Sequence, residues 1–203
     1  MCGRYALSQT PEELREHFRV PAVPAFAANL DVRPTNLMPV IHLSQTGERQ
    51  CTLMRWGLIP SWAKERTIAS KLFNARAETI ATLPSFRSAF RKRHCLVPAS
   101  HFYEWMTLPD GRKRKYGIGL TDERLFAFAG LHEWWQSPEG EEILSFTIIT
   151  CRANELIRPI HAKNRMPVIV SPEHYARWLD LSAPNAYALL MPYATDEMVA
   201  EPA

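Results

Sequence analysis

The sequence predicts an α+β fold in which antiparallel strands predominate. Two pairs of apolar segments flank short turn sequences, Pro-Asp-Gly at residues 109–111 and Ser-Pro-Glu-Gly at residues 137–140, as in β-hairpins. Helix-start signals lie outside these pairs, so helices should surround the strands rather than alternate with them. The 16 prolines against 8 glycines also favour many short elements joined by rigid turns. A length of 203 residues fits a single domain, residues 1–203, with a well-buried core.

The first expected element is a helix that begins after Thr10. Threonine can cap a helix, Pro11 suits the first turn, and Glu13 completes a capping box with Thr10. Leu14 and Phe18 then fall on one face of the helix, four residues apart.

The rest of the chain is predicted as strands with two further helices. Residues 22–39 are rich in Pro, Ala and Asn and are expected to be irregular. Helices are expected at residues 84–90 and from Ser171, where Ser-Pro-Glu is followed by apolar residues at helical spacing. No pattern is visible beyond Tyr193, and we expect a mobile tail there. Strands are expected at residues 40–43, 53–59, 102–107, 114–120, 125–134, 143–150 and 168–170.

Composition and the N-terminal sequence indicate a soluble, cytoplasmic protein, and a monomer is expected, although no sequence feature specifies the oligomeric state. No apolar run approaches the length of about 18 residues that a membrane span needs, and the N-terminus lacks the apolar core of a secretion signal. The four cysteines are scattered without a C-x-x-C pair, so neither a metal site nor a disulfide framework is expected. No motif calls for an organic cofactor. The net charge of +3 permits nucleic-acid binding without arguing for it, and basic clusters at 87–93 and 112–115 equally suit a solvated surface.

Cys2 is the first candidate for chemistry. Removal of Met1 would leave a free α-amine, with a pKa near ~8, beside a thiol with a pKa of about 8.5. Such an amine can condense with an aldehyde, and the neighbouring sulfur can close onto the imine carbon to give a five-membered thiazolidine. A cysteine at this position is also ordinary terminal sequence, so the residue alone does not decide between the two readings.

Three other polar residues are candidates for catalysis or substrate binding, and each also has a simple structural explanation. Glu104 lies in the aromatic strand segment F-Y-E-W, where its pKa could be raised for acid–base catalysis, or where it could simply reach water from an edge strand. His161 follows Arg-Pro-Ile and is either catalytic or structural. Asn74 could hold a substrate oxygen or cap the turn that follows it.

Five motifs in a fixed order link these residues. They are M-C-G-R-Y at 1–5, W-G-L-I-P-S-W at 56–62, N-A-R-A-E-T at 74–79, F-Y-E-W at 102–105 and I-H-A-K-N-R-M-P at 160–167. As a set they resemble the SOS-response-associated peptidase (SRAP) family, also called abasic-site processing proteins, from Met1 to about Val170 and the helix beyond. The resemblance implies the SRAP fold, in which antiparallel sheets form a barrel-like core with helices around it.

The resemblance also implies a covalent reaction with single-stranded DNA that contains an abasic site. Cys2 matches the residue that forms a thiazolidine with the opened sugar, which protects the lesion. Asn74 matches the asparagine that positions the sugar and the cysteine amine. Glu104 matches the acid that shuttles protons, and His161 matches the histidine that assists ring opening and bears on reversal.

DNA contacts are implied for a second group of residues. Arg4 and Arg76 match arginines that contact the DNA backbone at the lesion, which suits the bidentate geometry of guanidinium on phosphate. Trp62 and Trp105 are candidates for base stacking or for wedging the strand open, and core packing is the alternative for both. Pro34 lies in a segment similar to the family's Asn-x-x-Pro loop and is expected to touch DNA.

Two departures from the family pattern stand beside these expectations. Asp31 occupies the place of the loop asparagine, so a donor is lost and a negative charge is expected to face the DNA. The segment from His161 to Pro167 is longer than the commonest family pattern, H-x-R-M-P. Arg165 is carried over as a DNA contact, with Lys163 as the residue that could substitute for it.

Three other functions remain open at the level of sequence. Cys2, Glu104 and His161 could form a cysteine peptidase that removes Met1 autocatalytically or cuts other peptides. The basic clusters and tryptophans would suffice for a protein that binds single-stranded DNA without a covalent bond. A lyase that nicks abasic DNA through the same imine would use the same site.

Overall fold

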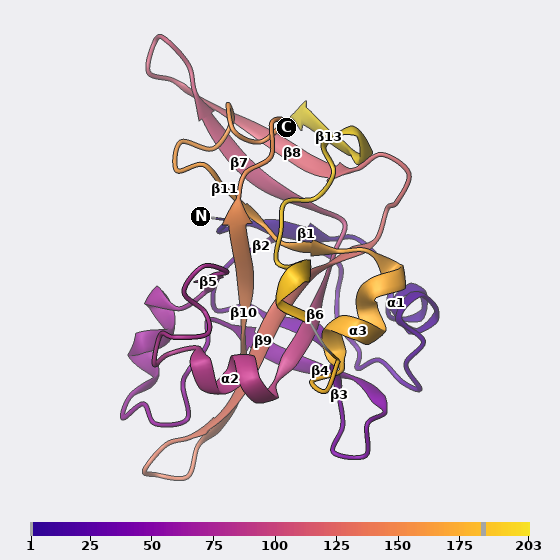
Figure 1. Cartoon of the computed structure of the whole chain (residues 1–203), viewed down its shortest axis with the longest axis vertical. Coiled ribbons are helices and arrows are strands. Elements are labelled where there is room, and N and C mark those ends of the chain that lie inside the picture. The colour runs from indigo at the N-terminus through magenta and orange to yellow at the C-terminus, as the bar shows by residue number, and fades with distance from the viewer. Residues whose placement is uncertain (1, 184–185) are drawn as a thin grey trace.

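A closed ring of five strands forms the centre of the computed structural model, which describes residues 2–183 and 186–203. Strand β10 pairs with β9 on one side and with β4 on the other, and the ring runs β10–β4–β3–β6–β9. The β4–β10 pairing is parallel and the other four are antiparallel. Figure 1 shows β9 and β10 as the long central strands of this barrel. Its strands are β3 (Leu37–Leu43), β4 (Arg49–Trp56), β6 (His94–Ala99), β9 (Phe126–Gln136) and β10 (Glu142–Arg152).

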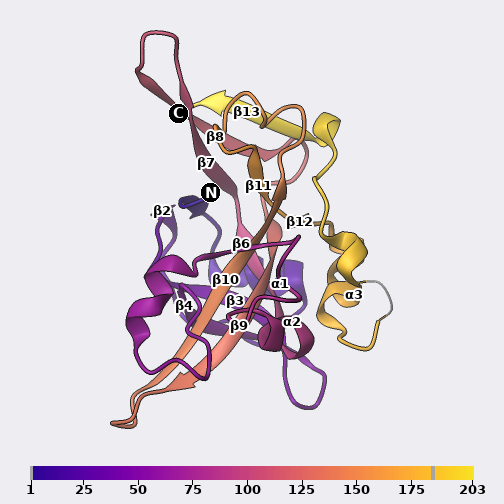
Figure 2. The same cartoon turned by 60° about the vertical axis from the view of Figure 1, so that its left-hand side comes forward.

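A second, five-stranded antiparallel sheet lies at one end of the barrel. Its order is β13-β8-β7-β1-β2, so the N-terminal strand β1 sits between β7 and β2. Figures 1 and 2 show the β7–β8 hairpin projecting away from the barrel at this end. The strands are β1 (Tyr5–Leu7), β2 (Asn29–Val32), β7 (His101–Thr107), β8 (Lys113–Leu120) and β13 (Met198–Pro202).

Short strands and helices surround the barrel. β5 (Asn74–Arg76) and β11 (Arg165–Pro167) both pair with the last residues of β10, and β12 (Ile169–Val170) pairs with β9. The helices are α1 (Pro11–Phe18), α2 (Arg87–Lys92) and α3 (Tyr175–Leu179), with 3-10 turns at Arg66–Lys71, Pro172–His174, Ala186–Leu189 and Thr195–Glu197. Among the described residues, no helix combines the length and apolar character that crossing a membrane requires.

Aromatic side chains join the first strand to the barrel. The ring of Tyr5 lies 5.2 Å from that of Trp56 on β4 and 5.8 Å from that of Phe128 on β9. Trp56 stacks on Phe146 of β10 at 6.2 Å. All four side chains are fully buried, so β1 is anchored by apolar contact as well as by its pairing with β7.

The predicted α+β class and the predicted local signals are confirmed. Thr10 and Glu13 form the capping box, and Leu14 and Phe18 are the buried residues of α1. Gly111 and Gly140 take positive φ angles of 83° and 92° in the two hairpin turns, a conformation that glycine adopts without strain. The helix after Ser171 is present, with a first turn of 3-10 geometry.

Several boundaries and elements differ from the sequence-based expectation. Residues 22–39 were expected to be irregular, but β2 and the start of β3 lie there. The strand expected at residues 53–59 ends at Trp56, because Gly57 turns the chain with a φ of 118°. β6 was not expected: all six of its residues are buried, so it shows no alternation and contains Pro98. The tail beyond Tyr193 is not free, since β13 pairs with β8 over five residues.

Candidate functional site

The pairing of β1 with β7 brings Cys2 close to Glu104. Tyr5 pairs with Phe102, and the Tyr103 amide donates to the carbonyl of Arg4 at 2.9 Å, so the residues before Tyr5 run alongside Glu104. Cys2 is fully buried, and its Sγ contacts the carbonyl oxygen of Arg4 at 3.6 Å. Burial raises the pKa of the Cys2 thiol well above its ordinary value, and the negative charge of Glu104 acts in the same direction. The thiol is therefore protonated at neutral pH and lies within electrostatic reach of a carboxyl group.

Glu104 and His161 form a buried pair. Nε2 of His161 lies 3.5 Å from Oε2 of Glu104, and the two residues are 7% and 4% exposed. Burial raises the pKa of Glu104 from 4.5 to about 7, and burial lowers the pKa of His161 from 6.5 to about 4. At neutral pH the imidazole is thus uncharged, and the carboxyl group is divided between its two protonation states. Because the imidazole carries no charge, the contact is an acid–base pair and not a salt bridge.

A backbone hydrogen bond determines the tautomer of His161. The amide of Arg165 donates to Nδ1 of the ring at 3.1 Å, which requires Nδ1 to carry no proton. The proton of the neutral ring is then on Nε2, the nitrogen that faces Glu104. The segment before the histidine is also held in place, since Asn154 Oδ1 accepts from the Ile157 amide and the His161 amide donates to the Ile157 carbonyl.

Asn74 approaches the same end of the barrel from β5. Its Nδ2 donates at 3.1 Å to the carbonyl of Phe73, which also accepts from Nε1 of Trp56 at 2.8 Å. The Phe73 carbonyl thus links Asn74 to Trp56, and Trp56 packs on Tyr5 at the start of β1. Within the described part of the chain, Asn74 Oδ1, Glu104 Oε1 and the Tyr5 hydroxyl are buried without a hydrogen-bond partner. Unpaired polar atoms of this kind are costly unless a ligand or water satisfies them.

Tyr5 is a further candidate site residue, which the sequence did not single out. Burial raises the pKa of its hydroxyl well above the ordinary value, and the nearby Cys2 acts in the same direction. The motif M-C-G-R-Y contained it, but nothing in the motif indicated that its hydroxyl lies beside Cys2.

Arg4 and Asp31 belong to one network of charges. Arg4 Nε lies 3.4 Å from Asp31 Oδ1, and its guanidinium lies 5.3 Å from the ring centre of Trp105. Asp31 also accepts from Arg33, and this hydrogen bond lowers the pKa of Asp31. The negative charge of Asp31 is therefore offset by two arginines. The half-buried ring of Trp105 forms part of the same surface.

The other residues predicted to contact DNA differ in exposure. Arg76 is exposed, and Trp62 is 57% exposed with its Nε1 donating to the Pro84 carbonyl at 3.3 Å. Pro34 is half-buried at the turn between β2 and β3. The side chain of Arg165 is only 11% exposed, because it pairs with Glu78 at 2.6 Å. Lys163, in the same loop, is exposed.

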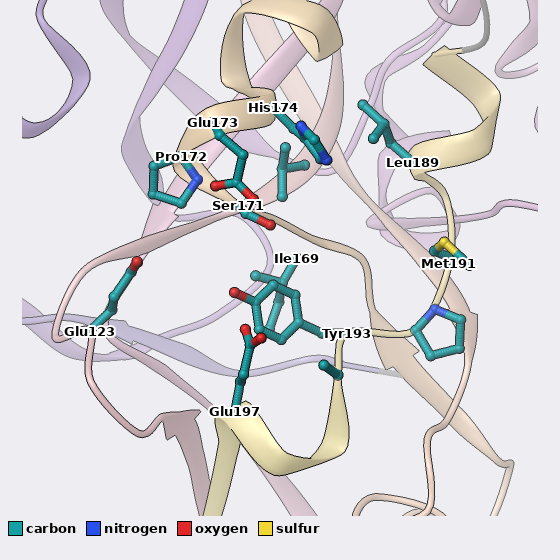
Figure 3. Close-up of a pocket in the computed structure, with 13 residues that line it drawn as sticks. Glu123, Ile169, Ser171, Pro172, Glu173, His174, Leu189, Met191, Tyr193 and Glu197 are labelled. Carbon is teal, nitrogen blue, oxygen red and sulfur yellow. The ribbon is translucent and has the colours of Figure 1, made fainter.

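A cavity of about 380 Å³ lies elsewhere in the molecule (Figure 3). It is lined by carboxylates from Glu123, Glu173 and Glu197 around Tyr193, and none of the predicted site residues lines it. In the described part of the chain, no three His, Cys, Asp or Glu side chains are grouped so as to hold a metal ion.

The chemistry available at Cys2 follows from these positions. A buried thiol lies beside a carboxyl group whose pKa of about 7 allows it to accept and return a proton near neutral pH. A neutral imidazole with a defined tautomer contacts that carboxyl group, and an asparagine oxygen lies unpaired at the same end of the barrel. Arg76 and Trp62 are exposed, and the half-buried Trp105 lies beside Arg4. The arrangement combines a nucleophile, an acid–base pair and groups that can hold an anionic, aromatic polymer.

Comparison with known proteins gives a consistent result over the full length. A model of the SOS response associated peptidase (SRAP) family matches residues 1–203. The abasic site processing protein YoqW of Bacillus subtilis (strain 168) is 39% identical over 207 aligned residues, covering 98% of this chain and 91% of that protein. The abasic site processing protein HMCES of Xenopus tropicalis is 28% identical, covering 100% of this chain and 73% of that protein.

Solved structures show the same fold. A crystal structure of a protein from Bacteroides thetaiotaomicron superposes with a TM-score of 0.91 at 29% identity, covering 99% of this chain and 91% of that chain. A protein from Bordetella bronchiseptica superposes with a TM-score of 0.87, also at 29% identity, covering 100% and 99% of the two chains.

Proposed function

The chain belongs to the SOS response associated peptidase (SRAP) family, and on that premise we propose that it processes abasic sites in DNA by covalent capture. The capturing group is the aminothiol that Cys2 presents once Met1 has been removed. The substrate is the ring-opened sugar of an abasic site in single-stranded DNA. The product is a thiazolidine that links the protein to the DNA and protects the lesion.

One observation carries this proposal: the pairing of β1 with β7 places Cys2 within electrostatic reach of Glu104, and Glu104 in turn contacts His161. The unpaired oxygen of Asn74 suits the task of holding a sugar hydroxyl or the cysteine amine. The thiol is fully covered in the chain that still carries Met1, so the proposal requires that removal of Met1 also uncovers it.

The chemical steps balance without a cofactor or a redox partner. The amine of Cys2 adds to the sugar aldehyde, and loss of one water gives an imine. Sγ then adds to the imine carbon while its proton passes, through the Glu104 carboxyl, to the imine nitrogen. One C–N and one C–S bond form, and the carbonyl oxygen leaves as water. His161, uncharged at neutral pH, can assist opening of the sugar ring before the first step.

The surface around Cys2 supports the choice of DNA. The exposed Arg76 and the half-buried Arg4 carry positive charge at this end of the barrel, and Trp105 lies under Arg4. The exposed ring of Trp62 can stack on a base, a contact that contributes ~1–3 kcal/mol where it forms. Pro34 belongs to the turn beside Asp31 and Arg33. Arg165 can contact DNA only if its ion pair with Glu78 breaks, whereas the side chain of Lys163 is already exposed.

A denaturing gel tests the proposal directly. The protein is incubated with a single-stranded oligonucleotide that carries one abasic site, with the same oligonucleotide undamaged, and with a duplex that carries the lesion. Covalent capture predicts a slow band that survives denaturation and forms fastest with the damaged single strand. A tag placed ahead of Cys2 blocks the amine and should abolish the band.

The alternatives give different results in the same assay. A protein that binds DNA without a covalent bond would produce no band that resists denaturation. A peptidase would cleave peptides in the absence of DNA, and a lyase would release a cleaved strand rather than retain it. Equal crosslinking by tagged and untagged protein would disprove the role of the terminal amine.

Arg76→Ala should weaken DNA binding and flatten its dependence on salt. The slope of log K against log salt is expected to fall in magnitude by about one, because a single phosphate contact is lost. Fluorescence anisotropy on undamaged single-stranded DNA at several salt concentrations measures this without the chemical step. Arg91→Ala, an exposed arginine on α2, which packs against β6 and β9, serves as the control and should leave the slope unchanged. Equal slopes for Arg76→Ala and the parent would remove Arg76 from the phosphate contacts.

A further inference from the structure

The side chain of Arg165 is clamped by groups from two other segments. NH1 and NH2 of its guanidinium donate to the two carboxylate oxygens of Glu78, at 2.6 and 3.0 Å. NH2 also donates to the carbonyl of Thr150 on β10 and lies 3.2 Å from its hydroxyl. The bidentate geometry with Glu78 restrains both the position and the plane of the guanidinium.

The backbone of the same residue holds His161. The Arg165 amide donates to Nδ1 of His161, and a turn makes this possible: the Asn164 amide donates to the His161 carbonyl at 2.8 Å. Asn164 takes a left-handed conformation with a φ of 52°, which reverses the chain so that the next amide points back at the ring. The extra length of this segment, relative to H-x-R-M-P, is thus a defined turn.

We propose that Glu78 is a positioning residue, which fixes Arg165 so that the Arg165 amide keeps His161 in the tautomer that directs its Nε2 proton at Glu104. The inference rests on the proposed function, because the pair of His161 and Glu104 is the acid–base pair of that reaction. Its chain of contacts runs from Glu78 through Arg165 and His161 to Glu104.

The length of the loop explains why a clamp is needed. A longer segment between His161 and Pro167 has more conformations available, so more restraint is needed to keep the Arg165 amide on Nδ1. The backbone of this loop is held at its end, where the Ala153 amide donates to the Asn164 carbonyl at 3.1 Å and β11 begins at Arg165. Glu78 adds a side-chain restraint from the N-A-R-A-E-T segment. The same clamp occupies the guanidinium that sequence reasoning assigned to DNA, which leaves the exposed Lys163 for that contact.

Nitrogen-15 NMR of the histidine ring, recorded without DNA, tests the first half of the inference. The parent protein should show His161 as a single tautomer with the proton on Nε2. Glu78→Ala should show a mixture of both tautomers. Glu141→Ala is the matched control, because Glu141 also pairs with an arginine, Arg66, and its side chain is 50% exposed against 48% for Glu78. It should leave the His161 signals unchanged.

Capture kinetics at saturating abasic DNA test the second half. The first-order rate should fall about tenfold in Glu78→Ala, as expected for partial loss of an oriented acid–base group, and stay at the parent value in Glu141→Ala. Glu78→Gln should recover most of the rate, since its amide oxygen still accepts from Arg165. An unchanged tautomer in Glu78→Ala, or a changed tautomer with an unchanged rate, overturns the inference. If the parent captures no abasic DNA, the proposed function fails, and the NMR result still decides whether Glu78 controls the tautomer.

Discussion

Cys2→Ala should abolish the denaturation-resistant band with abasic DNA completely. Alanine keeps an α-amine at the new terminus, so an imine can still form, but no sulfur remains to close the ring and the imine hydrolyses during denaturation. The loss should exceed that of every other single substitution, because it removes a reactant rather than a catalytic aid. Quantifying the slow band on a denaturing gel after incubation at neutral pH measures it.

Two control experiments distinguish the loss of the thiol from a loss of folding. Cys51→Ala replaces a half-buried cysteine on β4 and should leave the band at the parent level. Borohydride added during the reaction should trap the imine of Cys2→Ala as a stable amine, which shows that the variant still binds and positions the sugar. A full-strength band from Cys2→Ala without borohydride would rule out the thiazolidine.

Glu104→Gln should slow capture by about 10²-fold at pH 7 while leaving affinity for single-stranded DNA nearly intact. The amide cannot take the thiol proton or return it to the imine nitrogen, and its shape preserves the contact with His161. The parent rate should titrate near pH 7, since burial raises the pKa of Glu104 to about 7. Rates at saturating DNA from pH 5.5 to 8.5 should lose this transition in the variant; a retained transition would assign the proton transfer to another group.

The same substitution should make the fold more stable at alkaline pH. The native pKa of Glu104, about 7, lies above its ordinary value of 4.5, so the folded state holds the proton more tightly than the unfolded state. The contribution of Glu104 to stability is therefore fully present below pH 4.5 and is lost as the pH rises to about 7. Above that range Glu104→Gln should unfold with a free energy higher by roughly 3 kcal/mol, and near pH 4 the two proteins should be alike. Urea unfolding at both pH values measures the difference, and parallel behaviour at the two would contradict it.

If Glu104→Gln stabilises the fold and also slows capture, then the ionised carboxylate of Glu104 lowers the stability of the fold and is retained for the reaction. Glu104 has one carboxylate oxygen buried without a hydrogen-bond partner in the described part of the chain. Sequence-level reasoning expected either a catalytic glutamate or one that reaches water. Its 4% exposure excludes the second option.

Short-range features of this protein could be deduced from sequence because their determinants lie within a few residues of one another. The capping box of Thr10 and Glu13, the glycines of the two hairpin turns and the α+β class all belong to this group. The order of five motifs likewise identified the family, and with it the candidate residues. Elements whose signal is not local, such as the uniformly buried β6 and the paired tail strand β13, were missed.

Tertiary structure alone decided how the candidate site is assembled. The parallel contact of β10 with β4 closes the barrel, and the pairing of β1 with β7 puts Cys2 beside Glu104. The pKa of Glu104 and the tautomer of His161 follow from burial and from the amide of Arg165, and Arg165 itself turns toward Glu78 instead of solvent. The physical reason is the same in each case: desolvation and hydrogen bonding depend on neighbours that are distant in the chain, and residue types and their spacing do not specify those neighbours.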